Sequence, residues 1–337
     1  MRTPTGNGRP EASAPPARSS TASPSRSSAV SLTLRALASG SSGNATLVSG
    51  RDATILVDCG TSARELTARL YACGIDPRSL DAILITHAHV DHYRAAGTMN
   101  RRFGIPVHVD PSTARSLAHC GRNSSWRQLR ETRPIPGRIG AIEITPIDVP
   151  HGEPGRTGRT VAFHFESDRV RAAVVTDLGT VPEAGLSRLR GVDGLILEAN
   201  YDEETVRRKL ADPRFLHDHH YLSWVASDRG HLSNRQCAEA IATIATEATH
   251  HVILGHLSTN HPDSARDNND PRNALETVRG ILRRQRVRAP ELTIAPRLGA
   301  LEAPPGPPVT LGSARRSIPL GNPLQRKWER KMPTTRG

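Results

Sequence analysis

The strongest constraint on the fold is the point where an apolar run, DAILIT (81–86), passes directly into HAHVDH (87–92). The run is typical of a buried strand, and ligand sites in α/β proteins form at the carboxyl ends of such strands. His87 and His89 are two residues apart, so an extended backbone directs both imidazoles the same way. Asp91 and His92 are adjacent, and a turn would send them to a second centre. We predict a metal-binding loop, with a histidine-rich surface turn as the alternative.

Three more polar residues terminate apolar runs farther along the chain, where a core residue would be expected to stay apolar. They are His151 after AIEITPIDVP, Asp177 at the end of AAVVTD, and His256 at the end of HVILGH. A carboxylate such as Asp177 can bridge two cations through its two oxygens. Imidazoles and carboxylates together favour Zn²⁺, with Mn²⁺ or Fe²⁺ as alternatives. Taken singly, Asp177 could cap a helix and His151 could be an ordinary loop residue.

Strand-like and helix-like runs alternate through the middle of the chain, which predicts a layered α/β domain with sheet between helices. Strands are expected at residues 31–37, 45–50, 53–58, 81–86, 106–109, 141–148, 160–165, 171–177, 194–199 and 251–256. Helices are expected at residues 62–73, 112–119, 181–190, 233–248 and 271–285. Cys237, Ile241 and Ile244 recur at helical spacing, which indicates one buried face.

The two ends of the chain differ in composition from its middle. Residues 1–30 are rich in Ser, Pro, Ala and Arg, and we predict that they are disordered. Residues 303–337 form a second tail, basic and rich in Pro and Gly, also predicted to be disordered, which leaves residues 31–302 as one folded domain. The net charge is +12, of which the first tail contributes +3 and the second +6. The middle is only mildly basic, so charge alone is weak evidence for nucleic-acid binding.

Cysteine usage and hydropathy indicate the compartment. The four cysteines at 59, 73, 120 and 237 are widely spaced and include no C-x-x-C pair, which favours reduced thiols. No run reaches the roughly 18 apolar residues of a membrane-spanning helix. The first arginines are followed by no apolar stretch of a secretory signal. We therefore expect a cytoplasmic protein with no membrane partner.

HAHVDH resembles the signature of the metallo-β-lactamase superfamily, and ILVDCG (55–60) resembles the aspartate-containing strand that precedes it. The resemblance implies a four-layer αββα sandwich over residues 31–302 and a centre for two divalent metal ions. It assigns one metal to His87, His89 and His151, the other to Asp91, His92 and His256, and the bridging position to Asp177. Asp58 would support the metal loop without touching a metal.

Three further segments resemble the YycJ/WalJ-like branch of that superfamily: LASGSSGNATLV (37–48), LEANYD (197–202) and GHLSN (230–234). GHLSN also resembles a ribonuclease Z pattern, which implies that His231 is a general acid and that Glu198 orients it and favours its protonated form. The alternatives are a backbone-bonded residue preceding a helix for His231 and a structural salt bridge for Glu198. The chain reads His151-Gly152-Glu153 where the branch reads H-D-A, a departure that concerns substrate choice.

These observations predict a dinuclear metal-dependent hydrolase that cleaves phosphodiesters, most simply a DNA exonuclease-like nuclease using a metal-bridging hydroxide as nucleophile. Asp91 would take part in catalysis as well as in metal binding. In the turn GSSGN (40–44), Ser41, Ser42 and Asn44 would either contact a substrate phosphate or only form the turn. The alternatives are a small-molecule or cyclic-nucleotide phosphodiesterase, a β-lactamase- or thioesterase-like hydrolase, and a metal-bound scaffold or regulatory protein. The oligomeric state stays open, a dimer included.

Overall fold

The computed structural model describes residues 32–119, 124–129, 131–258, 268–297 and 304–312, which form two sheets packed face to face. The first sheet has the order β13-β1-β2-β3-β4-β5 and the second β12-β11-β10-β9-β8-β7-β6. The strands of the first are β1 (Leu32–Ala38), β2 (Ala45–Ser49), β3 (Thr54–Val57), β4 (Ala82–Ile85), β5 (Val107–Val109) and β13 (Val309–Leu311). Those of the second are β6 (Arg138–Ile139), β7 (Ile142–Asp148), β8 (Val161–Ser167), β9 (Val170–Val175), β10 (Gly194–Glu198), β11 (His251–Gly255) and β12 (Glu291–Ile294).

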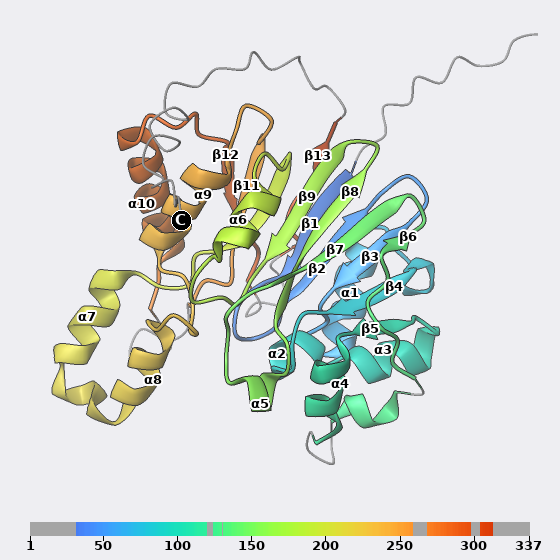
Figure 1. Ribbon diagram of the computed structural model, residues 1–337. Coiled ribbons are helices and arrows are strands. Elements are labelled where there is room, and N and C mark those ends of the chain that lie inside the picture. The colour runs from blue at the N-terminus through green and yellow to red at the C-terminus, as the bar shows by residue number, and fades with distance from the viewer. Residues whose placement is uncertain (1–31, 120–123, 130, 259–267, 298–303, 313–337) are drawn as a thin grey trace, which may run out of the picture.

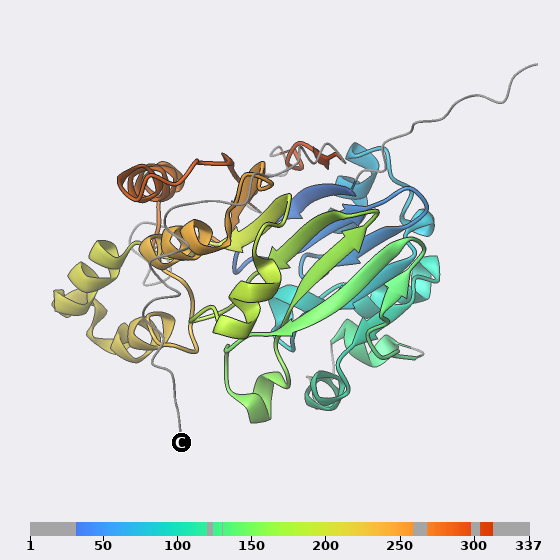
Figure 2. The ribbon, with the colours of Figure 1, turned by 45° about the horizontal axis from the view of Figure 1, so that its top comes forward.

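Helices cover both outer faces of the pair of sheets (Figures 1 and 2). On the side of the first sheet lie α1 (Ala63–Ala72), α3 (Ala96–Phe103) and α4 (Pro111–Ala118), and on the side of the second lie α6 (Glu183–Leu189), α9 (Asn234–Ile244) and α10 (Pro271–Arg284). Short α2 (Val90–Tyr93) and α5 (Pro154–Thr157) belong to loops, and α7 (Glu203–Ala211) and α8 (His219–Val225) lie beside each other, away from both sheets. Short 3-10 turns occupy Pro77–Ser79, Ser125–Gln128 and Pro213–Asp218.

The alternation of side chains along the strands explains the four layers. In β4, Leu84 belongs to the cluster between the two sheets, whereas Ile83 and Ile85 belong to the cluster beneath α1 and α3. In β9, Val174 points into the same inter-sheet cluster and Val175 into the cluster beneath α9 and α10. Strands buried on both faces are expected to be continuous apolar runs, as these are. The predicted αββα sandwich is confirmed.

Strand direction brings the ends of distant segments together. β3 and β4 are parallel in the first sheet, and β9, β10 and β11 are parallel in the second. β7 and β9 are both antiparallel to β8, so β7 also ends at the edge where β9 ends. The polar residues that follow these strands therefore collect at one end of the sandwich, where α/β proteins bind ligands.

The structure contains elements that the sequence analysis did not predict, α3 and α7 among them. Val309–Leu311, expected in a disordered tail, forms β13, which pairs antiparallel with β1 and buries Leu311 between the sheets. Three residues are too few for a periodic pattern to indicate a strand. This strand forms because the edge of β1 offers backbone hydrogen-bond partners. The segment FLHDHHYL (215–222), outside the helices expected from the sequence, is helical and enters α8. Residues 1–31 and 313–337, the bulk of the two predicted tails, lie outside the described residues.

Two compositional expectations can be compared with the structure. Cys59, Cys73 and Cys237 are free thiols, and Cys120 lies outside the described residues. Among the helices of the described ranges, none combines the length and the apolar character needed to cross a bilayer.

Candidate metal centre

The structure brings all seven predicted ligands together at the strand ends described above. His87 follows β4, His89 to His92 begin α2, His151 follows β7, Asp177 follows β9 and His256 follows β11. They form two groups in which every ligand atom lies within 4.8 Å of the others: His87, His89, His151 and Asp177 in one, and Asp91, His92 and His256 in the other. The division is the one that the sequence resemblance implies, although the metal roles of the individual residues remain predictions.

In the first group, three imidazole nitrogens and one carboxylate oxygen converge. His89 Nδ1 lies 2.9 Å from His87 Nε2 and 3.2 Å from His151 Nε2. Asp177 Oδ1 lies 3.6 Å from His151 Nε2. A tetrahedral Zn²⁺ with bonds of about 2.0–2.1 Å separates neighbouring ligand atoms by roughly 3.3 Å. The first group has the donor set and the spacing of such a site.

In the second group, Asp91 Oδ2 lies 3.6 Å from His92 Nε2 and 3.7 Å from His256 Nε2. Asp177 also reaches this group, because its Oδ2 lies 3.1 Å from His92 Nε2 and its Oδ1 lies 3.4 Å from His256 Nε2. Asp177 is therefore placed between the two groups, as a bridging carboxylate would be. The His and Asp clusters suit a dinuclear divalent metal site.

Hydrogen bonds on the far side of the rings fix which nitrogen faces the centre. A carboxylate only accepts, so His92 carries a proton on Nδ1 and donates it to Asp58 Oδ2 at 2.7 Å, which leaves Nε2 for the centre. Asp58 is itself held by the Thr86 backbone N–H at 2.9 Å. His151 Nδ1 donates to the Gly230 carbonyl at 2.7 Å in the same way. Partners of this kind orient metal-ligating histidines in proteins.

Glu198 is the hub of a second set of hydrogen bonds. Its Oε1 accepts from the Leu232 backbone N–H at 2.7 Å and its Oε2 from the Asp177 N–H at 2.9 Å. The same Oε2 lies 3.1 Å from His231 Nδ1 and 3.2 Å from His256 Nδ1. The expected contact of Glu198 with His231 is present. The contact of Glu198 with His256 was not predicted from the sequence. In this second contact Glu198 orients the ring of a candidate metal ligand, as supporting carboxylates do in metal sites.

Two observations indicate that the centre is built for a cation. His256 Nε2, in the second group, and Asp177 Oδ2, which reaches that group from the first, are buried with no hydrogen-bond partner among the described residues. Asp58, Asp177 and His256 also have positive φ angles of 59°, 60° and 51°. Each such residue costs about 1–3 kcal/mol, and this strain gathers at functional sites. Buried polar atoms without partners, held beside two clusters of ligand atoms, fit a site for two divalent cations.

The charges of the two groups differ. Burial lowers the pKa of His87 well below 6.5 and that of His151 to about 3, so the first group offers neutral imidazoles. Burial opposes charge on His256 too, but nearby carboxylates, Asp177 above all, outweigh it and raise its pKa to about 10. The pKa of His92 is raised well above 6.5 for the same reason. Without a cation, protons on these two histidines balance the carboxylates.

Neighbouring backbone clamps the HAHVDH loop. The Asp91 carbonyl accepts from the Asn44 N–H at 2.8 Å, and the His92 carbonyl accepts from the Cys59 N–H at 2.8 Å. A Cβ on Gly60 would lie 1.5 Å from the Asp91 carbonyl oxygen. A side chain at position 60 would therefore clash with the ligand loop, which explains why a glycine follows Asp58 and Cys59.

The residues predicted to contact a phosphate lie beside this clamp. Asn44 is buried: its Oδ1 accepts from the Gly40 N–H at 2.9 Å, and its Nδ2 lies 3.0 Å from His92 Nε2. These contacts are those of a turn that supports the ligand loop. Ser41 and Ser42 are exposed at the tip of the turn. Contact of these three residues with a phosphate remains a prediction.

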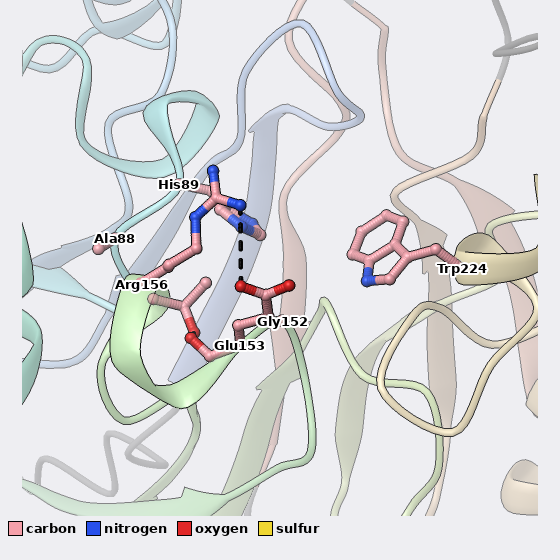
Figure 3. A pocket seen from close by; sticks show the side chains of 7 residues that line it. Ala88, His89, Gly152, Glu153, Arg156 and Trp224 are labelled. Carbon is pink, nitrogen blue, oxygen red and sulfur yellow. Dashed lines mark hydrogen bonds and ion pairs between the residues drawn. The ribbon is translucent and has the colours of Figure 1, made fainter. Parts of the chain in front are cut away.

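A pocket of about 280 Å³ adjoins the first group, with His89 on its wall. Figure 3 shows Trp224 on one side of it and the exposed Glu153–Arg156 pair on the other. Trp224 and Arg156 were not singled out from the sequence. Two features of the sequence could have indicated them. Trp224 is one of three tryptophans in the chain and lies seven positions before His231, and Arg156 lies in the Gly/Pro-rich loop that follows His151.

A family model described as a beta-lactamase superfamily domain matches residues 53–257. The chain belongs to the β-lactamase superfamily. Within it, the chain is similar to Exodeoxyribonuclease WalJ of Streptococcus pneumoniae, with 32% identity over 229 residues that cover 66% of this chain and 80% of that protein. It is 27% identical to Exodeoxyribonuclease YycJ of Bacillus anthracis over 66% of this chain and 81% of that one. The predicted superfamily and its YycJ/WalJ-like branch are confirmed.

A solved structure of this superfamily shows the same fold. The metallo-beta-lactamase fold protein YhfI from Bacillus subtilis is 15% identical, covers 83% of this chain and 99% of its own, and gives a TM-score of 0.57. At this identity the likeness concerns the arrangement of sheets and helices.

Proposed function

We propose that this protein is a dinuclear metal-dependent nuclease that degrades DNA as an exonuclease. The relatives named exodeoxyribonucleases support the reaction class and the substrate. The observation that carries the proposal is the contact of His231 Nδ1 with Glu198 Oε2 at 3.1 Å beside the candidate ligands, which supports a proton-donating part for His231.

We assign one metal to His87, His89 and His151, the other to Asp91, His92 and His256, and the shared position to Asp177. Zn²⁺ suits this set of imidazoles and carboxylates, with Mn²⁺ or Fe²⁺ as alternatives. When bound, the two cations supply Lewis acidity, which lowers the pKa of water and offsets the charge of a phosphodiester.

The chain's own residues supply the remaining chemistry. An alkoxide leaving group needs a proton, and the candidate ligands cannot give one while they hold metal. His231 Nδ1 lies 3.9 Å from Asp177 Oδ1, and the His231 ring stacks on that of His256 with centroids 5.0 Å apart. Because Glu198 holds Nδ1, the Nε2 of His231 is the atom that donates the proton. Burial raises the pKa of Glu198, but His231 and other donors overcome this and lower it to about 2, so Glu198 stays ionised.

Asp91 completes the catalytic set. It is partly exposed, whereas Asp177 is buried, so the Asp91 carboxylate is the more accessible of the two to solvent. This position supports its proposed double part in binding metal and orienting the attacking water. A thioesterase has less use for a proton donor of this kind, because a thiolate departs more easily than an alkoxide.

A small-molecule or cyclic-nucleotide phosphodiesterase is the second candidate, favoured by the modest size of the pocket beside His89. A substrate panel separates the two. Metal-reconstituted protein is offered end-labelled DNA, end-labelled RNA, a cyclic nucleotide and a thioester. We expect stepwise release of mononucleotides from DNA, and turnover of the cyclic nucleotide alone would contradict the proposal. Asp177→Asn should abolish the activity, while Asp212→Asn should keep it, because Asp212 only caps the 3-10 turn Pro213–Asp218 and an asparagine side chain can still cap that turn.

A further inference from the structure

The pocket beside the metal centre has one aromatic wall, formed by Trp224 of α8. The indole lies edge-on to His231, with ring centroids 5.3 Å apart and planes at 89°, and 5.7 Å from the ring of His151. A Cβ on Gly230 would lie 2.1 Å from the Trp224 carbonyl oxygen, so the backbone of Trp224 is packed tightly against the segment that carries His231. With its backbone fixed and its ring in contact with His231 and His151, the indole forms a flat surface next to the candidate proton donor.

The opposite wall carries the guanidinium of Arg156, whose ion pair with Glu153 can break. Arg156 in α5 lies 3.7 Å from Glu153, and both side chains are strongly exposed. Exposed ion pairs of this kind contribute little free energy, about 0–1 kcal/mol. The guanidinium can therefore leave Glu153 for a phosphate, whose oxygens it binds in a bidentate fashion. Glu153 belongs to the segment His151-Gly152-Glu153, in which this chain departs from the H-D-A sequence of the YycJ/WalJ-like branch.

We propose that this pocket binds one nucleoside of the substrate strand next to the scissile phosphodiester, with its base stacked on Trp224 and an adjacent phosphate bound by Arg156. The proposal rests on the proposed nuclease function and adds a substrate-binding pocket to it. A volume of about 280 Å³ suits one nucleoside rather than a base pair, so we expect the strand to enter by an unpaired end. Stacking on an aromatic ring accepts any base, which suits an enzyme that degrades DNA without regard to sequence.

The Trp224 contact is tested with paired oligonucleotides that carry or lack the base next to the scissile bond. For the unmodified protein we expect kcat/KM to fall about 5- to 150-fold when the base is removed, as for the loss of one aromatic stacking contact. Trp224→Ala should cleave both substrates at similar rates, and Trp224→Phe should restore most of the preference. A preference that persists in Trp224→Ala overturns the stacking contact while leaving the nuclease function intact. If the unmodified protein cleaves no oligonucleotide, both proposals fail.

The Arg156 contact is tested by the salt dependence of single-strand binding, measured with a non-cleavable phosphorothioate strand. Each phosphate neutralised on a single strand contributes about 0.7 to the slope of log K against log salt. Arg156→Ala should reduce the slope by about this amount. The matched control is Arg207→Ala in α7, which removes another exposed arginine paired with a glutamate three residues away, outside the pocket. Equal slopes for Arg156→Ala and Arg207→Ala would overturn the phosphate contact.

Discussion

Removal of metal should make the stability of this protein fall as pH rises above about 6.5. In the metal-free centre, the carboxylates around His256 raise its pKa to about 10 against the effect of burial, and they also raise that of His92. A histidine whose pKa is higher in the folded state stabilises that state fully below its unfolded pKa, near 6.5. The stabilisation is lost as pH rises through the folded pKa. For His256, a rise from 6.5 to about 10 corresponds to a contribution on the order of 5 kcal/mol.

The assay is urea unfolding of chelator-treated protein at pH 6, 7, 8 and 9. Each of the two histidines can contribute a fall of up to about 1.4 kcal/mol per pH unit in the free energy of unfolding. Protein loaded with metal should show a weaker dependence, because the cations replace the protons. His256→Gln should reduce the slope, whereas His164→Gln should not, since burial and nearby arginines lower the pKa of His164 to about 4. A metal-free stability that stays flat or rises from pH 6.5 to 9 would refute this reasoning.

Three further substitutions probe other parts of the centre. His231→Ala should slow DNA cleavage about 10²–10⁴-fold and an activated nitrophenyl phosphodiester far less; equal losses in steady-state kinetics would exclude a general acid. Gly60→Ala should weaken metal binding in calorimetric titration, because its Cβ would displace the Asp91 carbonyl; unchanged affinity would show that the clamp is unimportant. Asp58→Asn should lower metal affinity about 10–100-fold by loosening His92, and an unaltered affinity would remove Asp58 from its supporting position.

The candidate ligands could be found from sequence because of where they stand in their strands. His151, Asp177 and His256 each end an apolar run, and parallel strands place such ends at one edge of a sheet. Residues more than a hundred positions apart are therefore brought together by a regularity that a single sequence displays. The contact of Glu198 with His231 was predicted from the GHLSN resemblance, and it is present in the structure.

What the sequence could not reveal depends on packing between segments with no common pattern. The second contact of Glu198, with His256, requires the register of β10 against β11. The pocket requires α5 and α8 to face each other across the centre, and neither helix was predicted. β13 forms only because the edge of β1 offers hydrogen bonds to a three-residue segment. In each case a tertiary contact supplies the information.

The most direct test of a two-metal nuclease is DNA cleavage measured while metal-free protein is titrated with Zn²⁺ or Mn²⁺. Both groups of ligands must be filled, so we expect cleavage to stay low up to one equivalent per chain and to rise to a plateau at two. Asp91→Ala, which removes a ligand from the second group only, should bind one equivalent and remain inactive. Full cleavage by chelated protein, or a plateau at one equivalent, would contradict a dinuclear centre.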